Sequence, residues 1–506
     1  MTQMTQIKKM YLRHLCHLWM GLPVLLVTTP VLAELPTRET PLGRLTLRIA
    51  PESFKLSPDQ RRLAFVAVAE TAQEPTPSKP GNSLEPPPLD AEKKRPPARV
   101  WLDNKSHKSY AAITMPVFSP DSQKLAYAAD IGGAWRILID GVEQAAEFQG
   151  VPDTPVVFSP DSKRMAVVAR IKNQWHISVD DQLSPPYEGI GNNTFTFSPD
   201  SKSVAYVIRS GTGWQMLVNH APAGTYKQFS TYRWAPNSAL VAVIAKDKAD
   251  TQLFAGKFVS ESYAAFARNM PIFSADGRRV AFAAADKPIA NKTANWFVGI
   301  GDVVTGEAQN TSPKLGAVLD GTPVFVGETL YYFALTKDNR WQLYADHKPV
   351  GDPVSAVAAY SFTVSPDGKH YAYGTVKSGF STIIRDGKPA GTYDELGVGT
   401  WSWSPDSQRL AVAARKKDRW HVIADGYEGP PVLSVGQSQI SFSADSKTVA
   451  YTAMDVERKW RVYVNDKYST PVDAFARGSY VVLTESQAQT IAVKNRQAVR
   501  LEVELK

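Results

Sequence analysis

Histidine offers this chain its widest range of possible chemistry, because it can bind a metal or transfer protons near neutral pH. Two histidines directly follow a recurring tryptophan, and two others directly follow an aspartate or asparagine at a recurring turn. None forms a paired metal-binding motif. Recurrence at equivalent places favours structural or surface roles, although histidines from separate repeats could still meet in space. The histidines after residue 33 are His107, His176, His220, His347, His370 and His421.

The recurrent aspartates also invite a chemical interpretation. Asp121, Asp161, Asp200, Asp406 and Asp445 each follow Ser-Pro or Ser-Ala, and each supplies one carboxylate where calcium takes six to eight oxygens. Turn capping explains them better. The chain has no Gly-x-Ser-x-Gly motif, no Gly-rich phosphate loop ahead of a helix, and Cys16 as its one cysteine. We therefore predict no catalytic residues, no metal site and no cofactor.

Basic residues recur in one class of loop, between an alanine-rich run and the next tryptophan. A ring of such charges could attract an acidic partner or an anionic envelope polymer. Acids in other loops partly cancel the charge, and solvated surface charge is the alternative explanation. The predicted binding residues are Lys172, Arg340, Lys416, Lys417, Arg419 and Arg458.

The elements that carry these residues repeat along the chain. Nine pieces resemble "FSPDSQKLAYAA" at Phe118, and most neighbours are 37 to 40 residues apart. A tenth, eroded copy is "VFVGETLYYFAL" near Phe325. Six tryptophans keep the same period, and Trp101 and Trp296 are assigned to the same place in looser copies. Each repeat is predicted to form four short strands joined by tight turns.

Four-stranded units of about 40 residues are the sequence signature of an all-β propeller. An alanine stands at an equivalent place in the second predicted strand of every clear copy, between large residues. Alternation along a strand puts the alanine on one face and its large neighbours on the other. We therefore expect the adjacent blade to approach closely at positions such as Ala166 and Ala205.

These repeats resemble those of the TolB-like, WD40-related propellers of bacterial envelope proteins, on the "FSPDSxxxAxxA" pieces and on "IGDVVTGEAQ" near Asp302. The resemblance covers nearly the whole chain after residue 33. It implies a propeller fold and a place among partner-binding scaffolds, lyases and gating domains of peptidases. The chain departs from TolB proper because it has more repeats and no separate α/β domain before them.

About ten or eleven repeat units can be counted, the last with only three strands. Residues 43–50 are expected to supply its fourth strand and so join the chain ends. We expect two propellers, or a two-lobed arrangement, formed by residues 34–320 and 321–506; one large ring is the alternative.

Residues 1–33 have the layout of a secretory signal peptide, with Lys8, Lys9 and Arg13 before an apolar run that ends at Ala33. Its removal would lower the net charge from +8 to about +5 and remove the cysteine. Residues 70–98 form a proline-rich insertion, predicted to be an extended loop. Since binding often uses variable loops on a rigid frame, we place function on the face that carries this insertion.

The sequence therefore predicts an exported protein, periplasmic or secreted, with no membrane span after cleavage and no nucleic-acid partner. A non-catalytic scaffold for a protein or peptide is the leading interpretation. A carbohydrate- or peptide-processing lyase or hydrolase in the propeller channel, and a structural protein that binds an anionic polymer, are the alternatives.

Overall fold

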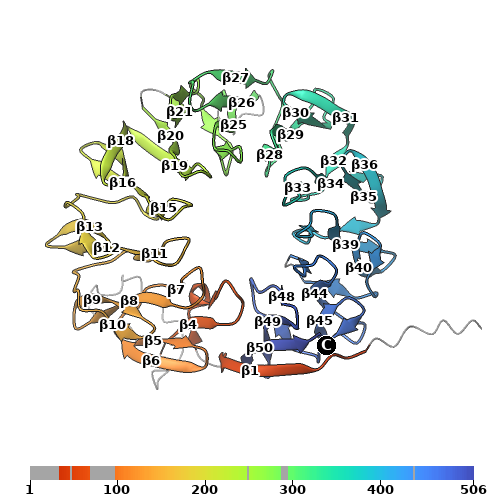
Figure 1. Cartoon of the computed structure of the whole chain (residues 1–506), viewed down its shortest axis with the longest axis horizontal. Helices are drawn as coiled ribbons and strands as arrows, with labels where there is room; N and C mark the ends of the chain where they lie inside the picture. The colour runs from red at the N-terminus through yellow and green to blue at the C-terminus, as the bar shows by residue number, and fades with distance from the viewer. Residues whose placement is uncertain are drawn as a thin grey trace, which may run out of the picture.

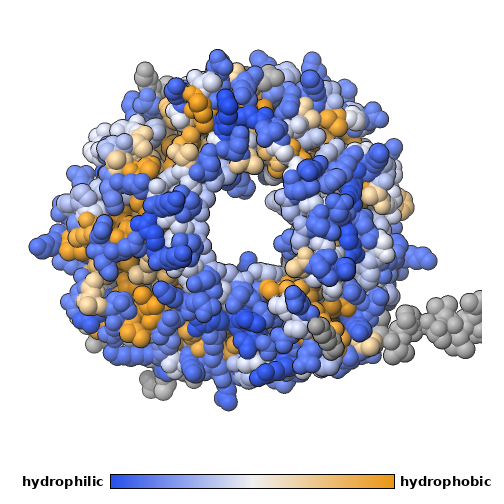
Figure 2. Space-filling model, viewed as in Figure 1, coloured by the Kyte–Doolittle hydropathy of each residue, from blue (hydrophilic) through white to orange (hydrophobic). Residues whose placement is uncertain are grey.

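The computed structural model describes residues 33–45, 48–68, 97–247, 250–286, 295–436 and 439–505. These residues form eleven antiparallel sheets arranged in one ring (Figure 1). The space-filling view shows an open channel through its centre (Figure 2). Their only helical element is a short 3-10 turn, η1 (Pro51–Ser53). Within these ranges no apolar helix is long enough to cross a membrane. The predicted signal peptide and proline-rich insertion lie outside them, apart from Ala33, Pro97 and Ala98.

Each sheet is one blade, numbered 1 to 11 along the chain, and its second and third strands form its centre. The second strands are β4 (Leu63–Val68), β8 (Leu125–Ile131), β12 (Met165–Ile171), β16 (Val204–Ser210), β20 (Val241–Lys246), β25 (Arg279–Ala285), β29 (Thr329–Leu335), β34 (Tyr371–Lys377), β39 (Leu410–Lys416), β44 (Val449–Met454) and β49 (Gln487–Lys494). The third strands are β5 (Ala98–Leu102), β9 (Ala134–Ile139), β13 (Gln174–Val179), β17 (Gly213–Val218), β21 (Thr251–Ala255), β26 (Trp296–Asp302), β30 (Trp341–Ala345), β35 (Phe380–Arg385), β40 (Arg419–Ala424), β45 (Trp460–Val464) and β50 (Gln497–Glu504).

The first strands line the channel and the fourth strands form the outer margin. In Figure 1, β11 (Val156–Phe158), β15 (Thr196–Phe197) and β28 (Val324–Val326) lie on the inside. β18 (Ala221–Tyr226) and β31 (Lys348–Val354) lie on the outside. The blade at Phe325 confirms that the eroded copy is a full repeat.

The two chain ends close the ring. β1 (Thr37–Arg44) pairs antiparallel with β50 from Thr37↔Val503 to Arg44↔Gln497 and becomes the outermost strand of blade 11. Closure by the N-terminal segment was predicted, but the closing strand is 37–44 rather than 43–50. Arg48–Ile49 (β2) instead pairs with β4 in blade 1.

The preferred arrangement of two propellers is wrong, and the alternative of one large ring is confirmed. The expected division at residue 320 falls between β27 (Ala308–Thr311) and β28, where the ring continues from blade 6 to blade 7. Sequence periodicity weakens there, yet the second and third strands of both blades keep their pairing.

The hydrophobic core is divided among the blade boundaries. The described residues form eleven buried clusters, and each lies between two neighbouring blades. The predicted alanines face these boundaries: Ala166 of blade 3 is fully buried in one cluster with Tyr206 of blade 4. Ala411 of blade 9 is similarly buried with Tyr451 of blade 10. A small residue on one blade therefore accommodates a large one on the next.

Two boundaries depart from this pattern. In blade 7 the alanine position holds Tyr331, whose ring centroid lies 4.8 Å from that of Tyr371 in blade 8. In blade 11 the position holds Gln489, whose side-chain amide donates to the Asp59 carbonyl of blade 1 over 3.0 Å. Ring closure thus combines strand pairing with a buried polar contact.

A chain of hydrogen bonds at the Ser-Pro-Asp turns links consecutive blades. The backbone N–H of Asp121 in blade 2 donates to the Ser162 hydroxyl of blade 3 over 2.8 Å. Asp161 N–H donates in the same way to Ser201 of blade 4 over 3.0 Å. Both serines have positive φ, 61° and 65°, where glycine is usual. The hydroxyl contact gives a physical reason for serine at these strained positions.

Within each turn the aspartate has the capping role expected from the sequence. The Ser119 hydroxyl donates to Asp121 over 2.5 Å, and the Gln123 N–H donates to the same carboxylate over 3.0 Å. The hydrogen bond from Ser119 is the main cause that lowers the pKa of Asp121. The carboxylate thus stabilises its own turn.

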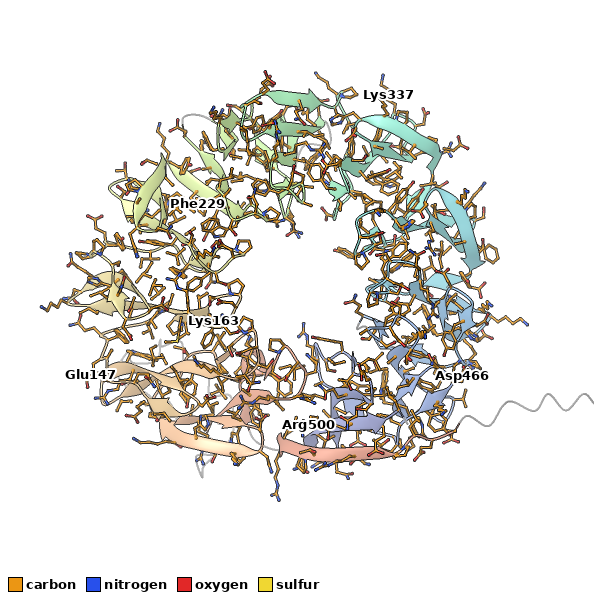
Figure 3. The ribbon with its side chains drawn as sticks, viewed as in Figure 1. Glu147, Lys163, Phe229, Lys337, Asp466 and Arg500 are labelled. Atoms are coloured by element: carbon orange, nitrogen blue, oxygen red, sulfur yellow. The ribbon has the colours of Figure 1, made fainter. Side chains whose placement is uncertain are left out.

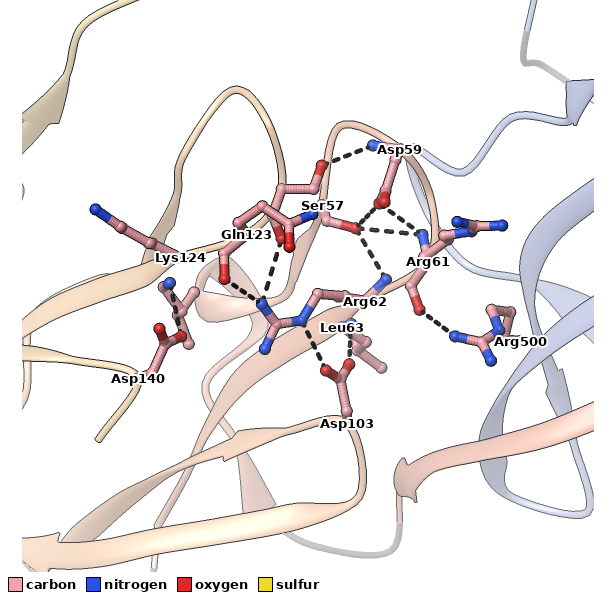
Figure 4. A network of polar contacts seen from close by, with 12 residues as sticks. Ser57, Asp59, Arg61, Arg62, Leu63, Asp103, Gln123, Lys124, Asp140 and Arg500 are labelled. Atoms are coloured by element: carbon pink, nitrogen blue, oxygen red, sulfur yellow. Dashed lines mark hydrogen bonds and ion pairs between the residues drawn. The ribbon is translucent and has the colours of Figure 1, made fainter. Parts of the chain in front are cut away.

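An arginine strengthens the same boundary in several blades (Figure 4). Arg62 of blade 1 pairs with Asp103 over 2.8 Å and donates to the Gln123 carbonyl of blade 2 over 2.9 Å. Arg164 repeats the arrangement with Asp180 and the Lys202 carbonyl of blade 4.

Replacement of Ala166 by leucine tests the close approach of blades 3 and 4. Overpacking against Tyr206 should lower the free energy of unfolding by about 1–3 kcal/mol. The measurement is chemical denaturation, with Ala146→Leu at an exposed position as control. Unchanged or increased stability of Ala166→Leu would contradict the packing described.

Ser162 allows a second test, of the turn contacts between blades. Ser162→Ala removes one interblade hydrogen bond and keeps the strained backbone, which should cost about 0.5–1.5 kcal/mol. Ser162→Gly loses the same bond but relieves the positive φ, so it should be the less destabilised variant in the same denaturation measurement. The opposite order would show that the positive φ at this position is not strained, and unchanged stability of both variants would show that the hydroxyl contact contributes nothing.

Candidate functional site

The strand order separates two ends of the ring. Because successive strands are antiparallel, the hairpins between second and third strands share one end with the connections from each fourth strand to the next blade. We call this end the 2–3 face. It is the face on which the sequence analysis placed function, and β4 and β5 flank the insertion there.

All the predicted basic residues lie on the 2–3 face and are exposed. They belong to the hairpins of blades 3, 7, 9 and 10, so the structure does not bring them into one cluster. Lys416, Lys417 and Arg419 share the hairpin of blade 9, and Arg458 lies in the next blade. Lys172 and Arg340 stand apart in blades 3 and 7. Lys337, from the same hairpin as Arg340, lies at the outer margin, whereas Lys163 lies at the channel rim (Figure 3).

Acidic residues offset part of this charge, as expected. Lys416 pairs with Glu428 and lies 5.8 Å from the ring centre of Tyr393. Arg340 donates to the Pro353 carbonyl, and Arg419 donates to the Asp418 carbonyl over 3.2 Å. Of the predicted set only Lys416 has a carboxylate partner within the described residues; Lys172, Arg340, Lys417, Arg419 and Arg458 keep their charge uncompensated there.

The histidines contact their own or a neighbouring blade. His107, His220 and His347 bind the hydroxyls of buried tyrosines through Nδ1; for example, His347 lies 2.9 Å from Tyr332. His176 and His421 bind carbonyl oxygens of the same blade. Within the described ranges no three His, Cys, Asp or Glu side chains gather as a metal site would require.

An interruption of the first strand shapes the inner part of the blade boundaries. In blade 4, residues Gly191 to Thr194 form a turn, in which the Thr194 hydroxyl donates to the Gly191 carbonyl over 2.8 Å. The same hydroxyl accepts from the Val207 N–H of the second strand. The hydroxyl oxygen thus replaces a backbone carbonyl as the acceptor for this N–H, because the bulged first strand does not supply one. Equivalent turns end at Ser361, Thr400 and Ser479.

A groove of about 730 Å³ lies between blades 10 and 11. Trp460 begins β45 of blade 10, and Phe475 lies in β47 (Ala474–Phe475) of blade 11. Their rings meet edge to face with centroids 6.0 Å apart. In Figure 2, hydrophobic surface lies at the lower right, over the blades of β44 and β48 (Val482–Leu483).

The interrupted strand of blade 11 forms one wall of this groove. Arg477 and Gly478 are the exposed central residues of its turn, and Ser479 closes the turn by donating to the Ala476 carbonyl over 2.7 Å. Tyr480 then anchors the wall to blade 1 through its hydroxyl, which donates to the Pro58 carbonyl over 2.6 Å. This wall of the groove is therefore held by hydrogen bonds within blade 11 and to blade 1.

The equivalent cavity at other blade boundaries has a different size and lining. Between blades 3 and 4 the equivalent cavity measures about 250 Å³ and contains Trp175, with Asn192 at the position of Arg477. Between blades 8 and 9 it is filled: a Cβ at Gly374 would meet Leu396 at 2.9 Å and Trp401 at 3.3 Å. The groove at blades 10 and 11 is thus a local specialisation of a repeated boundary.

Comparisons with known proteins give a fold likeness only. No protein-family model matches the chain, and no curated protein matches it. TolB from Acinetobacter baumannii is 18% identical over 58% of this chain and 59% of its own, with a TM-score of 0.22. The β-propeller domain of the Trilobed protease from Pyrococcus furiosus is 12% identical over 59% of this chain and 89% of its own, with a TM-score of 0.26.

A crystal structure of the eukaryotic initiation factor is 11% identical over 73% of this chain and 90% of its own, with a TM-score of 0.37. The propeller assignment rests on the chain's own sheet order, and the resemblance to the TolB-like family remains a prediction.

The groove was not predicted from the sequence, although a signal for the interrupted first strand was present. The segments "GNNTFTFSPD" and "GVGTWSWSPD" repeat a Ser or Thr several residues before the Ser-Pro-Asp turn.

The prediction that Trp101 holds the place of the repeat tryptophan is wrong. In blade 3 that place is Trp175, which pairs with Arg170; in blade 1 the equivalent pair is Ala98 with Val68. Trp101 stacks on Phe65 instead, with ring centroids 6.2 Å apart. Trp296 does hold the expected place.

His347 gives the ring a pH dependence. Burial lowers its pKa below the usual 6.5, and its Nε2 is buried without a partner among the described residues. Because the folded state favours neutral histidine, its contribution is complete above about pH 6.5 and declines as the pH falls below that value. Asparagine tolerates the positive φ of 66° at this position.

The melting temperature should therefore fall between pH 7.5 and pH 5, and the fall should be smaller in His347→Asn. The turn aspartates do not contribute in this range, because their pKa values lie below the usual 3.8. An equal fall in both proteins would exclude His347 as a source.

Proposed function

We propose that this chain is an exported, non-catalytic β-propeller scaffold that binds a protein or peptide partner in the bacterial envelope. The groove between blades 10 and 11 carries the proposal. It combines aromatic walls with a few polar groups, which is the usual composition of a binding site. It lies on the 2–3 face, beside the hairpin that carries Arg458.

The recurring polar side chains support a scaffold rather than a reaction centre. The turn aspartates hold their own turns, and the turn serines link blades. Five of the histidines bind tyrosine hydroxyls or carbonyls, and His370 binds the Asp386 carboxylate over 2.8 Å. These groups are engaged in holding the ring together. The proposed export rests on residues 1–33 and their signal-peptide layout.

Affinity capture from a bacterial envelope extract tests the proposal, with residues 34–506 as bait. A protein partner should bind the wild-type chain and be lost with Trp460→Ala combined with Phe475→Ala, since buried aromatic anchors carry much of an interface's binding energy. Trp175→Ala is the matched control in the smaller groove and should retain the partner. Equal capture by all three baits would refute the groove as the binding site.

Charge reversal tests the predicted basic residues in the same assay. Lys416→Glu, Lys417→Glu and Arg419→Glu together should weaken capture and reduce its dependence on salt if the hairpin of blade 9 contacts the partner. Unchanged affinity would show that these side chains are solvated and do not contact the partner.

A further inference from the structure

We infer that the groove between blades 10 and 11 recognises an extended, proline-containing acidic segment of its partner. This inference rests on the proposed scaffold function and specifies the chemistry of the ligand. Three properties of the groove carry it: an aromatic corner, a free cation and a free indole N–H.

The aromatic corner suits a flat, rigid, apolar group. Trp460 and Phe475 meet edge to face at an interplanar angle of 89°, so their rings stand at right angles, and both line the groove. Proline-rich segments dock into aromatic-lined grooves because their extended helix is already ordered and loses little entropy on binding. Val435, Ala474 and Ala476 complete an apolar lining.

The charge of the groove selects an acidic segment. Arg477 is the only charged residue among the described residues that line it. Arg477 is exposed, and no carboxylate among the described residues pairs with it. In the adjoining hairpin Arg458 and Lys459 balance the acids Asp455 and Glu457, and Asp455 is already paired with Arg461 over 2.8 Å, so the selection rests on Arg477. Opposite charge across a binding groove favours association and fixes the register of the ligand.

The indole N–H supplies the donor that an extended peptide requires. A proline-rich helix has no internal hydrogen bonds, so its carbonyl oxygens need outside donors. No acceptor for Trp460 Nε1 is found in the described part of the chain, and the nitrogen is not among the buried unpaired atoms. Trp460 can therefore offer its ring face to proline and its N–H to a neighbouring carbonyl.

The equivalent boundary between blades 3 and 4 provides an internal comparison. It keeps the tryptophan, as Trp175, but has Asn192 in place of the cation and about 250 Å³ of space instead of about 730 Å³. Recognition of an acidic segment is therefore expected at blades 10 and 11 alone.

Fluorescence anisotropy with a labelled Glu-Pro-Pro-Pro-Glu-Pro peptide and residues 34–506 tests the inference. Binding should weaken about tenfold in Trp460→Phe, which keeps the ring and loses the N–H, and by a similar factor in Arg477→Glu. Trp175→Phe and Asn192→Asp should leave it unchanged. A Lys-Pro-Pro-Pro-Lys-Pro peptide should bind far more weakly than the acidic one.

Four outcomes would overturn the inference. The first is equal binding of the acidic and basic peptides, and the second is equal loss in the blade 3 controls. The third is binding seen only after deletion of residues 70–96, which would assign the groove to the chain's own Glu-Pro-Pro-Pro segment. The fourth is that the wild-type chain captures an envelope partner, the groove variants lose it, and the acidic peptide does not bind. That result would reject this ligand class and leave the scaffold function standing.

Discussion

The structure depends on the fit between a small residue on one blade and a large one on the next. A four-stranded sheet with two apolar faces cannot bury both by itself, so every blade needs a neighbour on each side. Ala166 beneath Tyr206 shows how closely the sheets approach. An open row of blades would leave its two end faces in water. The pairing of β1 with β50 removes those ends, which explains why the N-terminal strand crosses to the last blade.

The Ser-Pro-Asp turns add hydrogen bonds between consecutive blades to this apolar packing. Hydroxyl contacts link blades 1 to 5 and blades 8 to 10. They stop where Gly277 and Gly368 replace the serine and where blade 7 has the shorter turn at Gly327. In that arc aromatic contacts such as Tyr331 with Tyr371 hold the blades together. The ring therefore tolerates different chemistry at its boundaries while it keeps one geometry.

Repetition also explains how a binding site can arise on such a frame. Many boundaries place a third-strand residue opposite an interrupted first strand of the next blade, so the ring offers the same location several times; blade 5, with its continuous β19 (Gln228–Trp234), is an exception. Side-chain size decides whether the place is filled, as at Gly374, or open, as at Trp460. Because Tyr480 also contacts blade 1, a ligand in the open groove would touch the part of the ring where the chain ends meet.

The sequence by itself determined the blade: its four strands, its turns, the alanine facing the next sheet and the repeat near Phe325. These features are local, because turn residues and alternation act over a few positions. The closing segment was recognised, but its register was shifted, since pairing of chain ends is a long-range choice. Only the tertiary structure decided between one ring and two, because that depends on small angles between blades. It also decided the groove, because Trp460 and Arg477 belong to different blades and meet only when the sheets pack.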